Sequence, residues 1–263
     1  MRIAAYQAPL LASGSMEAVD LIRQQVRRCE SEGIEILCCP EAILGGLADD
    51  AAAPDARALS VDGGELQMAL SPLASETVTT IVGFTERDAS GRLFNAAAVF
   101  HRGAVMGVYR KHHPAIRRSV YSAGDRVPVF TVGGLTFGIV ICRDSSFTEP
   151  AHTLAQRGAT VLFVPTNNAL PPSKTGPEIV DDARRCDIAR ACENAMTVIR
   201  ADTAGRTDSR IAYGATGITG PDGVVRVSAP LLTPTLVVGI VEAGMITVRD
   251  SRKPQLPAAP PAG

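Results

Sequence analysis

A short apolar run at residues 135–144 constrains the fold of this chain more than any other stretch. It reads Leu-Thr-Phe-Gly-Ile-Val-Ile-Cys-Arg-Asp and is rich in β-branched residues, which is typical of an α/β-protein strand buried on both faces. The run ends at Cys142, and Arg143 and Asp144 bring charge at once. α/β proteins usually place reactive groups at such a strand end. A core cysteine is the alternative, because free cysteines are often buried.

Two further strand ends carry a charged side chain. The apolar run at residues 34–39 ends in Pro40-Glu41, and a β-like run at residues 104–110 ends at Lys111. Taken singly, Glu41 is consistent with an exposed loop glutamate, and Lys111 with one basic residue of a solvated loop. With Cys142, however, they supply a carboxylate, an amine and a thiol at three strand ends.

The remaining chain alternates helical and β-like segments. Besides the run that ends at Cys142, we expect strands over residues 2–8, 34–39, 79–87, 94–101, 104–110, 127–132, 160–165, 196–202, 211–219, 224–228 and 235–241. We expect helices over residues 15–31 with Ser15 as the cap, 65–73, 150–157 and 177–195. This order predicts a single α/β domain over residues 1–252 with mixed sheets, layered sheet on sheet with helices outside. The Pro/Ala-rich tail, residues 253–263, is expected to be disordered.

Composition argues against several classes of function. The 263 residues are 46% hydrophobic and carry a formal net charge of −1 without a long run of one sign, so neither nucleic acid nor an anionic membrane is indicated. Six scattered cysteines with no C-x-x-C pair suit a reducing compartment, and those other than Cys142 read as core residues. No zinc-ligand spacing is present, so we expect no metal. The chain starts without a signal-peptide pattern, and its charge-free stretches are too short to span a bilayer, which predicts a cytoplasmic protein.

Two pairs of side chains have more than one interpretation. His112 or His113 could activate Cys142 as in papain-like enzymes, although solvated loop histidines are the preferred interpretation. Arg190 and Glu193 are three residues apart on one helix face and can form a structural ion pair.

The carboxylate, amine and thiol are the three groups that acyl transfer needs. A thiol needs a base to become a nucleophile. The oxyanion that forms on attack needs a positive donor, and the leaving amine needs a proton that the base can return. Glu41, Lys111 and Cys142 can fill these roles.

With these residues in view, the chain resembles the nitrilase, or carbon–nitrogen hydrolase, superfamily over most of its length. Each motif is weak alone, but the ordered set is specific. The matching segments are Cys38-Cys-Pro-Glu41, Tyr109-Arg-Lys111, Ile141-Cys-Arg-Asp144, Phe147-Thr-Glu149-Pro150 through Gly158-Ala159 to Pro165, Arg190-Ala-Cys-Glu-Asn194, and Tyr213-Gly214 through Pro221-Asp-Gly223.

The resemblance implies an αββα sandwich that usually dimerises through sandwich faces and uses no cofactor. It implies Glu41 as general base and acid, Lys111 as oxyanion stabiliser and Cys142 as nucleophile. The backbone N–H of Arg143 would complete the oxyanion hole. The strand end at residues 165–168 adds Asn167 and Asn168 as candidates for binding the substrate or oxyanion, and Arg190 with Glu193 would support the site.

The aspartate two residues after the nucleophile, Asp144, looks more like the amidase branches than true nitrilases. The resemblance therefore implies cleavage of a small amide or carbamoyl compound through a cysteine thioester. A nitrile-hydrolysing nitrilase is the alternative within the family.

One departure separates this chain from the family pattern. The family generally has a second glutamate before an aromatic-x-x-Gly motif, here Tyr121-Ser-Ala-Gly124. The preceding segment in this chain reads Ile116-Arg-Arg-Ser119, without a carboxylate. Its arginines could face an acidic substrate or point to solvent. The departure favours a weak or inactive family member that serves as a binding scaffold, and the intact set of Glu41, Lys111 and Cys142 favours an enzyme.

Overall fold

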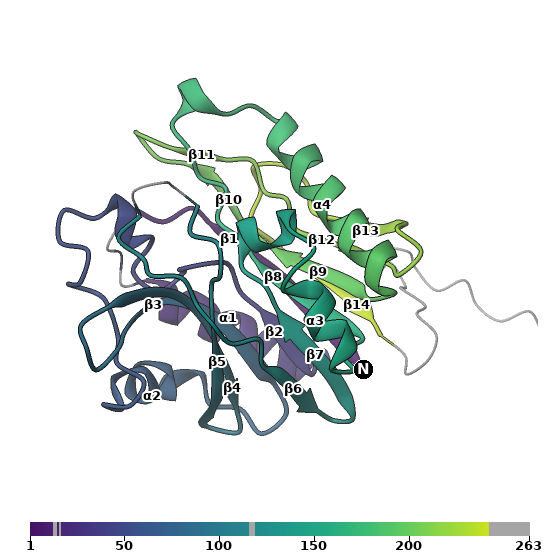
Figure 1. Ribbon diagram of the computed structural model, residues 1–263, viewed down its shortest axis with the longest axis horizontal. Coiled ribbons are helices and arrows are strands. Elements are labelled where there is room, and N and C mark those ends of the chain that lie inside the picture. Colours follow the sequence, from purple (N-terminus) through teal and green to yellow (C-terminus); the bar gives the residue numbers. More distant parts are fainter. Residues whose placement is uncertain (13–14, 16, 116–118, 242–263) are drawn as a thin grey trace, which may run out of the picture.

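The computed structural model describes residues 1–12, 15, 17–115 and 119–241, which form two mixed β-sheets and their covering helices (Figure 1). The segment without the second glutamate, residues 116–118, and the predicted disordered tail at residues 253–263 lie outside the described residues. Within the described part, no helix is long and apolar enough to cross a membrane.

The first sheet has eight strands in the order β11-β10-β1-β2-β3-β4-β5, with β14 also pairing with β1. Parallel pairing joins β10 to β1, β1 to β2 and β2 to β3, and the other pairs are antiparallel. The predicted antiparallel order of residues 79–110 is confirmed. The strands are β1 (Arg2–Pro9), β2 (Ile36–Cys38), β3 (Thr79–Arg87), β4 (Leu93–His101), β5 (Ala104–Arg110), β10 (Thr203–Arg206), β11 (Ile211–Ala212) and β14 (Thr235–Ile240).

The second sheet has six strands in the order β13-β12-β9-β8-β7-β6. Its central pairs, β7 with β8 and β8 with β9, are parallel, and its outer pairs are antiparallel. The strands are β6 (Val129–Val132), β7 (Leu135–Ile139), β8 (Val161–Pro165), β9 (Thr197–Ala201), β12 (Gly217–Thr219) and β13 (Val225–Ser228).

Helices cover the outer face of each sheet. In Figure 1, α2 lies on one side of the molecule and α4 on the other. The α-helices are α1 (Ala18–Ser31), α2 (Glu65–Leu70), α3 (Ala151–Gln156) and α4 (Glu178–Asn194). Short 3-10 turns are η1 (Ala48–Asp50), η2 (Ser71–Leu73), η3 (Cys142–Ser146) and η4 (Pro172–Lys174).

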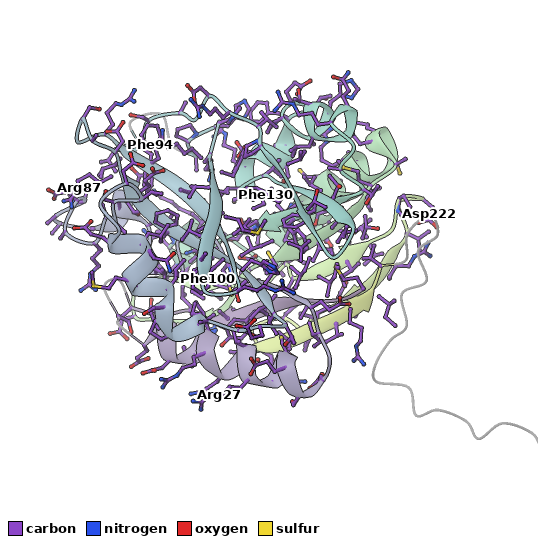
Figure 2. All side chains as sticks on the ribbon, turned by 90° about the horizontal axis from the view of Figure 1, so that it is seen from below. Arg27, Arg87, Phe94, Phe100, Phe130 and Asp222 are labelled. Carbon is purple, nitrogen blue, oxygen red and sulfur yellow. The ribbon has the colours of Figure 1, made fainter. Side chains whose placement is uncertain are left out.

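The alternation of side chains along the strands builds three apolar layers. In β1, Ile3 packs between the two sheets, whereas Ala4 packs with Ile22 of α1 on the outer face. In β8, Phe163 packs between the sheets and Leu162 packs outward with residues of α3 and α4. Figure 2 shows the side chains of the described residues and labels Phe130, which belongs to the layer between the sheets. The predicted αββα sandwich is therefore confirmed.

Two local predictions differ from the structure. Helix α1 begins at Ala18 with Glu17 as its N-cap residue, and Ser15 only accepts a hydrogen bond from the Glu17 N–H, so Ser15 is not the cap. The single strand predicted at residues 211–219 is two strands, because β11 pairs with β10 in the first sheet while β12 pairs with β9 in the second. The chain passes between the sheets at Gly214, whose φ of +83° suits glycine.

Candidate active site

Three strand ends converge where the sequence places the functional groups. Strand β5 runs in the same direction as β2, because β2 and β3 are parallel while β3–β4 and β4–β5 are both antiparallel. Glu41 after β2 and Lys111 after β5 therefore reach the same edge of the first sheet. Their side chains meet there, with Lys111 Nζ 2.5 Å from Glu41 Oε1.

The Glu41 carboxylate is buried and makes three polar contacts. Both Glu41 and Lys111 are only 2% exposed. Besides Lys111, Glu41 Oε1 accepts a hydrogen bond from Asn95 Nδ2 at 2.7 Å, and Oε2 accepts one from the Asn167 N–H at 2.9 Å. Burial is the largest single influence and opposes the charge on Lys111, but Glu41, Cys142 and Asp144 together outweigh burial and raise the pKa of Lys111 above its ordinary value. The ammonium is thus held charged beside the carboxylate.

Two glycines allow the backbone to pack closely around this pair. A Cβ on Gly83 of β3 would lie 2.4 Å from the Pro40 carbonyl oxygen, so only glycine lets the Glu41 loop lie against the sheet. A Cβ on Gly124 would lie 2.2 Å from the Arg110 carbonyl oxygen, and the Gly124 N–H donates to the Lys111 carbonyl oxygen at 2.8 Å. The glycine of the aromatic-x-x-Gly motif therefore holds the backbone of the lysine.

Cys142 is the first residue of η3, and its φ of +46° is rare for a residue with a side chain. Its Sγ lies 3.7 Å from Asn168 Oδ1, within reach of a weak S–H hydrogen bond. Burial and the charge of Glu41 raise the pKa of the Cys142 thiol to about 12, although Lys111 lowers it. The thiol is therefore protonated at neutral pH in the resting site, and attack needs a base.

Asp144 holds η3, the turn that begins at Cys142. This fully buried carboxylate accepts hydrogen bonds from the Ile141 N–H at 3.1 Å and the Tyr109 hydroxyl at 2.8 Å. It also accepts one from the His113 N–H at 2.8 Å, and His113 Nδ1 lies 3.0 Å away. The aspartate of the cysteine motif thus joins β5, the lysine loop and the turn.

Both histidines have partners other than the thiol. His113 Nδ1 faces Asp144, and its ring stacks on Phe147 with centroids 3.9 Å apart. The His112 ring stacks on Tyr109, and its Nε2 lies 3.0 Å from the Arg126 carbonyl oxygen. These contacts favour Glu41 over either histidine as the base.

The asparagines after β8 contact Glu41 and Cys142. The backbone N–H of Asn167 binds Glu41, as described above. Asn168 is fixed by Asp202, to which its N–H and Nδ2 each donate at 3.1 Å. Because Nδ2 is bound to Asp202, the Asn168 carbonyl oxygen is the atom directed at Cys142. A role for either residue in binding the oxyanion stays a prediction.

Arginines support the turn in different ways. Arg143 is exposed and donates from Nη1 to the Ala115 carbonyl oxygen, so the proposed role of its backbone N–H stays a prediction. Arg190 Nη2 lies 2.7 Å from both Glu193 carboxylate oxygens, which confirms the predicted ion pair. Arg190 Nη1 also donates to the Ser145 carbonyl oxygen at 3.1 Å, so the pair borders η3.

The cysteine prediction is wrong for two residues. Cys29, Cys38 and Cys39 are buried as expected, but Cys186 is half-buried and Cys192 is exposed. Both lie on α4, whose outer face meets solvent. All six thiols are free. In the described part of the chain, no group of three or more His, Cys, Asp or Glu residues could hold a metal ion.

Sequence reasoning missed two buried polar residues of the site. Asn95, on β4, donates a hydrogen bond to the Glu41 carboxylate, and Arg200, on β9, donates one to Ser145 of η3. Each interrupts an apolar strand, and a buried polar side chain in such a run needs a partner. That interruption is the signal that could have identified them.

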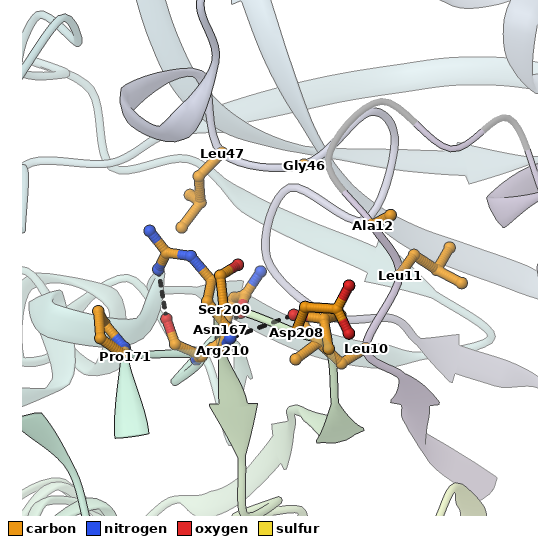
Figure 3. A pocket seen from close by; sticks show the side chains of 12 residues that line it. Leu10, Leu11, Ala12, Gly46, Leu47, Asn167, Pro171, Asp208, Ser209 and Arg210 are labelled. Carbon is orange, nitrogen blue, oxygen red and sulfur yellow. Dashed lines mark hydrogen bonds between the residues drawn. The ribbon is translucent and has the colours of Figure 1, made fainter. Parts of the chain in front are cut away.

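A cavity of about 440 Å³ opens beside Asn167 (Figure 3). Leu10, Leu47 and Pro171 give it an apolar wall, and Asp208 and Arg210 line its polar side. Arg210 Nη1 donates to the Ala169 carbonyl oxygen at 2.7 Å. The cavity therefore combines apolar and charged walls next to the residue that holds Glu41.

Comparisons with known proteins agree with this geometry. The sequence profile of the carbon–nitrogen hydrolase family matches residues 2–250. A "Hydrolase in pqqF 5'region" of Pseudomonas protegens is 29% identical over 249 residues, covering 92% of this chain and 83% of that protein. An (R)-stereoselective amidase of a Pseudomonas species is 30% identical over 181 residues, covering 68% of this chain and 62% of that protein. The chain thus matches less than two thirds of the length of that amidase.

Solved structures share the fold. An amidase of Nesterenkonia from the nitrilase superfamily superposes with a TM-score of 0.74 at 22% identity, covering 90% of this chain and 89% of that one. A glutamine-dependent NAD+ synthetase of Acinetobacter baumannii superposes with a TM-score of 0.79 at 18% identity over 94% of this chain, but over only 48% of that longer chain. With a family match over nearly its whole length and the fold of nitrilase-superfamily amidases, the chain belongs to the carbon–nitrogen hydrolase family.

Proposed function

We propose that the protein is an amidase that hydrolyses a small amide or carbamoyl compound through a thioester on Cys142. The observation that carries this proposal is the buried ion pair of Glu41 and Lys111, which acts on the thiol from the facing sheet. Both charges influence the Cys142 thiol electrostatically. Relatives named (R)-stereoselective amidase and N-carbamoylputrescine amidase support the choice of an amide or carbamoyl bond.

The first half-reaction acylates the enzyme. Glu41 takes the proton of the Cys142 thiol as Sγ attacks the substrate carbonyl carbon. Negative charge moves onto the carbonyl oxygen, where the Lys111 ammonium stabilises it. The C–N bond then breaks, Glu41 returns its proton to the leaving amine, and a thioester remains on Cys142.

The second half-reaction releases the acid. Glu41 takes a proton from water as the water oxygen attacks the thioester carbonyl, and Lys111 again stabilises the oxyanion. The C–S bond breaks, the proton passes from Glu41 to the Cys142 sulfur, and the free thiol is restored. The raised pKa of Cys142 suits this scheme, because the thiol is released in its protonated form.

Ammonia release across a panel of aliphatic amides, carbamoyl amines and nitriles tests the proposal. We expect release from at least one amide or carbamoyl amine by the wild type, and none by Cys142→Ala. Release from nitriles alone would favour the nitrilase alternative. No release from any compound by folded wild-type protein would favour a binding scaffold.

We further propose that the protein is a cytoplasmic homodimer. Six free thiols support a reducing compartment, and the resemblance to the family supports dimerisation through a sandwich face. Light scattering on the purified chain measures the oligomeric state, and a mass equal to one chain at micromolar concentration would contradict the dimer.

A further inference from the structure

Arg200 is a buried charge that the proposed reaction does not use. It lies on β9, inside the second sheet, and its side chain is 2% exposed. Along β9 it shares a face with Val198, which packs in the layer under α3 and α4. A guanidinium in such a place is costly unless its N–H groups are paired.

The partners of Arg200 come from three different elements. Nε donates to Asp187 Oδ2 on α4 at 2.8 Å, and Nη2 also bonds the Asp187 carboxylate. Nη1 donates to Thr166 Oγ1 at 2.7 Å, and Nη2 donates to Ser145 Oγ at 2.9 Å. Asp187 therefore fixes the guanidinium fork, and the fork holds two hydroxyl groups.

Each hydroxyl-bearing residue is bonded to a reacting residue. Ser145 Oγ donates to the Cys142 carbonyl oxygen at 2.8 Å. The Thr166 carbonyl oxygen accepts a hydrogen bond from the Glu41 N–H at 3.3 Å. The Arg200 side chain thus connects η3, which carries Cys142, with the end of β8, which holds the backbone of Glu41.

Stability alone does not account for this arrangement. Replacing a buried ion pair with packed apolar residues is often neutral or stabilising. We propose that Arg200 is a positioning residue that, held by Asp187, fixes Cys142 through Ser145 and the Glu41 loop through Thr166. The inference rests on the proposed function of Cys142 and Glu41, which it deepens.

Besides positioning the reacting residues, Arg200 lowers the pKa of the Cys142 thiol through its charge. Burial and Glu41 raise the pKa of the Cys142 thiol, while Lys111 and then Arg200 lower it. Arg200 is therefore a second cation that favours the thiolate as the proton leaves for Glu41.

A double-mutant cycle between Arg200→Lys and Ser145→Ala tests the connection. Lysine keeps the charge but lacks the fork, so it cannot hold Asp187, Ser145 and Thr166 together. We expect each single variant to lower kcat on the order of tenfold, with KM nearly unchanged, because the reacting groups lose alignment. The double variant should be little worse than the worse single one, since both changes break the same chain of hydrogen bonds.

Thiol reactivity gives a readout that does not need a substrate. In Arg200→Met with Asp187→Leu, both charges of the pair are removed and neither stays buried without the other, so the protein should fold. Iodoacetamide at pH 8 should label Cys142 severalfold more slowly in this variant, because the thiol loses a cation that lowers its pKa and Ser145 loses the hydrogen bond that holds it. Labelling of the exposed Cys192 in the same sample should not change. Arg226→Met, which removes a surface arginine paired with Asp222, is the matched control and should leave both rates unchanged.

The outcomes separate this inference from the proposed function. Three results would each overturn the role of Arg200. They are a wild-type kcat in Arg200→Lys and Ser145→Ala, additive losses in the double variant, and an unchanged Cys142 labelling rate after removal of the ion pair. Full ammonia release by Cys142→Ala would instead overturn the proposed function, whatever the Arg200 variants do.

Discussion

Removing the charge of Lys111 should harm both catalysis and folding, and the structure indicates how much. In Lys111→Met, Glu41 keeps its hydrogen bonds from Asn95 and Asn167 but loses its ion pair with Lys111 while staying 2% exposed. Breaking one side of a buried ion pair typically costs about 3–5 kcal/mol. Against a total stability of roughly 5–15 kcal/mol, that loss is large.

The turnover of Lys111→Met should also fall on the order of a hundredfold or more, the usual cost of one lost oxyanion donor. Lys111→Arg should be nearly as inactive, because its larger planar fork cannot act as a point donor beside the tetrahedral centre.

Urea denaturation with kinetics on folded protein measures both effects. The double variant Glu41→Gln with Lys111→Met leaves no buried charge unpaired, so it should recover most of the lost stability and none of the activity. Wild-type stability in Lys111→Met, or near-normal turnover in Lys111→Met or Lys111→Arg, would refute the reasoning.

Three further predictions follow from the same site. Glu41→Gln should abolish ammonia release, because an amide cannot accept the thiol proton; if His113→Ala were the inactivating change and Glu41→Gln harmless, a Cys–His mechanism would be correct instead. Brief alkylation at pH 7.5, followed by peptide mass spectrometry, should label the exposed Cys192 at least as fast as Cys142, whose thiol is held protonated; preferential labelling of Cys142 would show a thiolate in the resting enzyme. The free energy of unfolding should decline above about pH 8.5, where the unfolded chain loses thiol protons that the folded chain keeps, with a slope of up to about 1.4 kcal/mol per pH unit for each such group. Burial raises the pKa of Cys29 and of Cys142 to about 12 and that of Cys38 further, so a flat profile from pH 8 to 10.5 would contradict these shifts.

The layers of the fold were predictable because they follow from local pattern. The apolar runs of β7 and β8 are buried on both faces, and the turns between β3, β4 and β5 fix antiparallel neighbours. The passage from β11 to β12 was not predictable, since residues 211–219 read as one strand. Only pairing with different sheets shows that the chain changes layer there.

The candidate site also has features that the sequence predicts and features that it does not. Glu41, Lys111 and Cys142 could be found because each stands where an apolar run ends. The net shift of the Cys142 pKa could not be predicted from the sequence, because it depends on how deeply the thiol is buried and on where Glu41 and Lys111 lie in the folded protein.

Detection of an acyl group on Cys142 tests the central claim most directly. Wild-type enzyme turning over an amide from the panel is quenched in acid, digested and analysed by peptide mass spectrometry. The mechanism predicts that the peptide with Cys142 gains the mass of the substrate minus ammonia, and that Cys142→Ala shows neither the adduct nor ammonia release. An adduct on another residue, or ammonia release by Cys142→Ala at the wild-type rate, would contradict it.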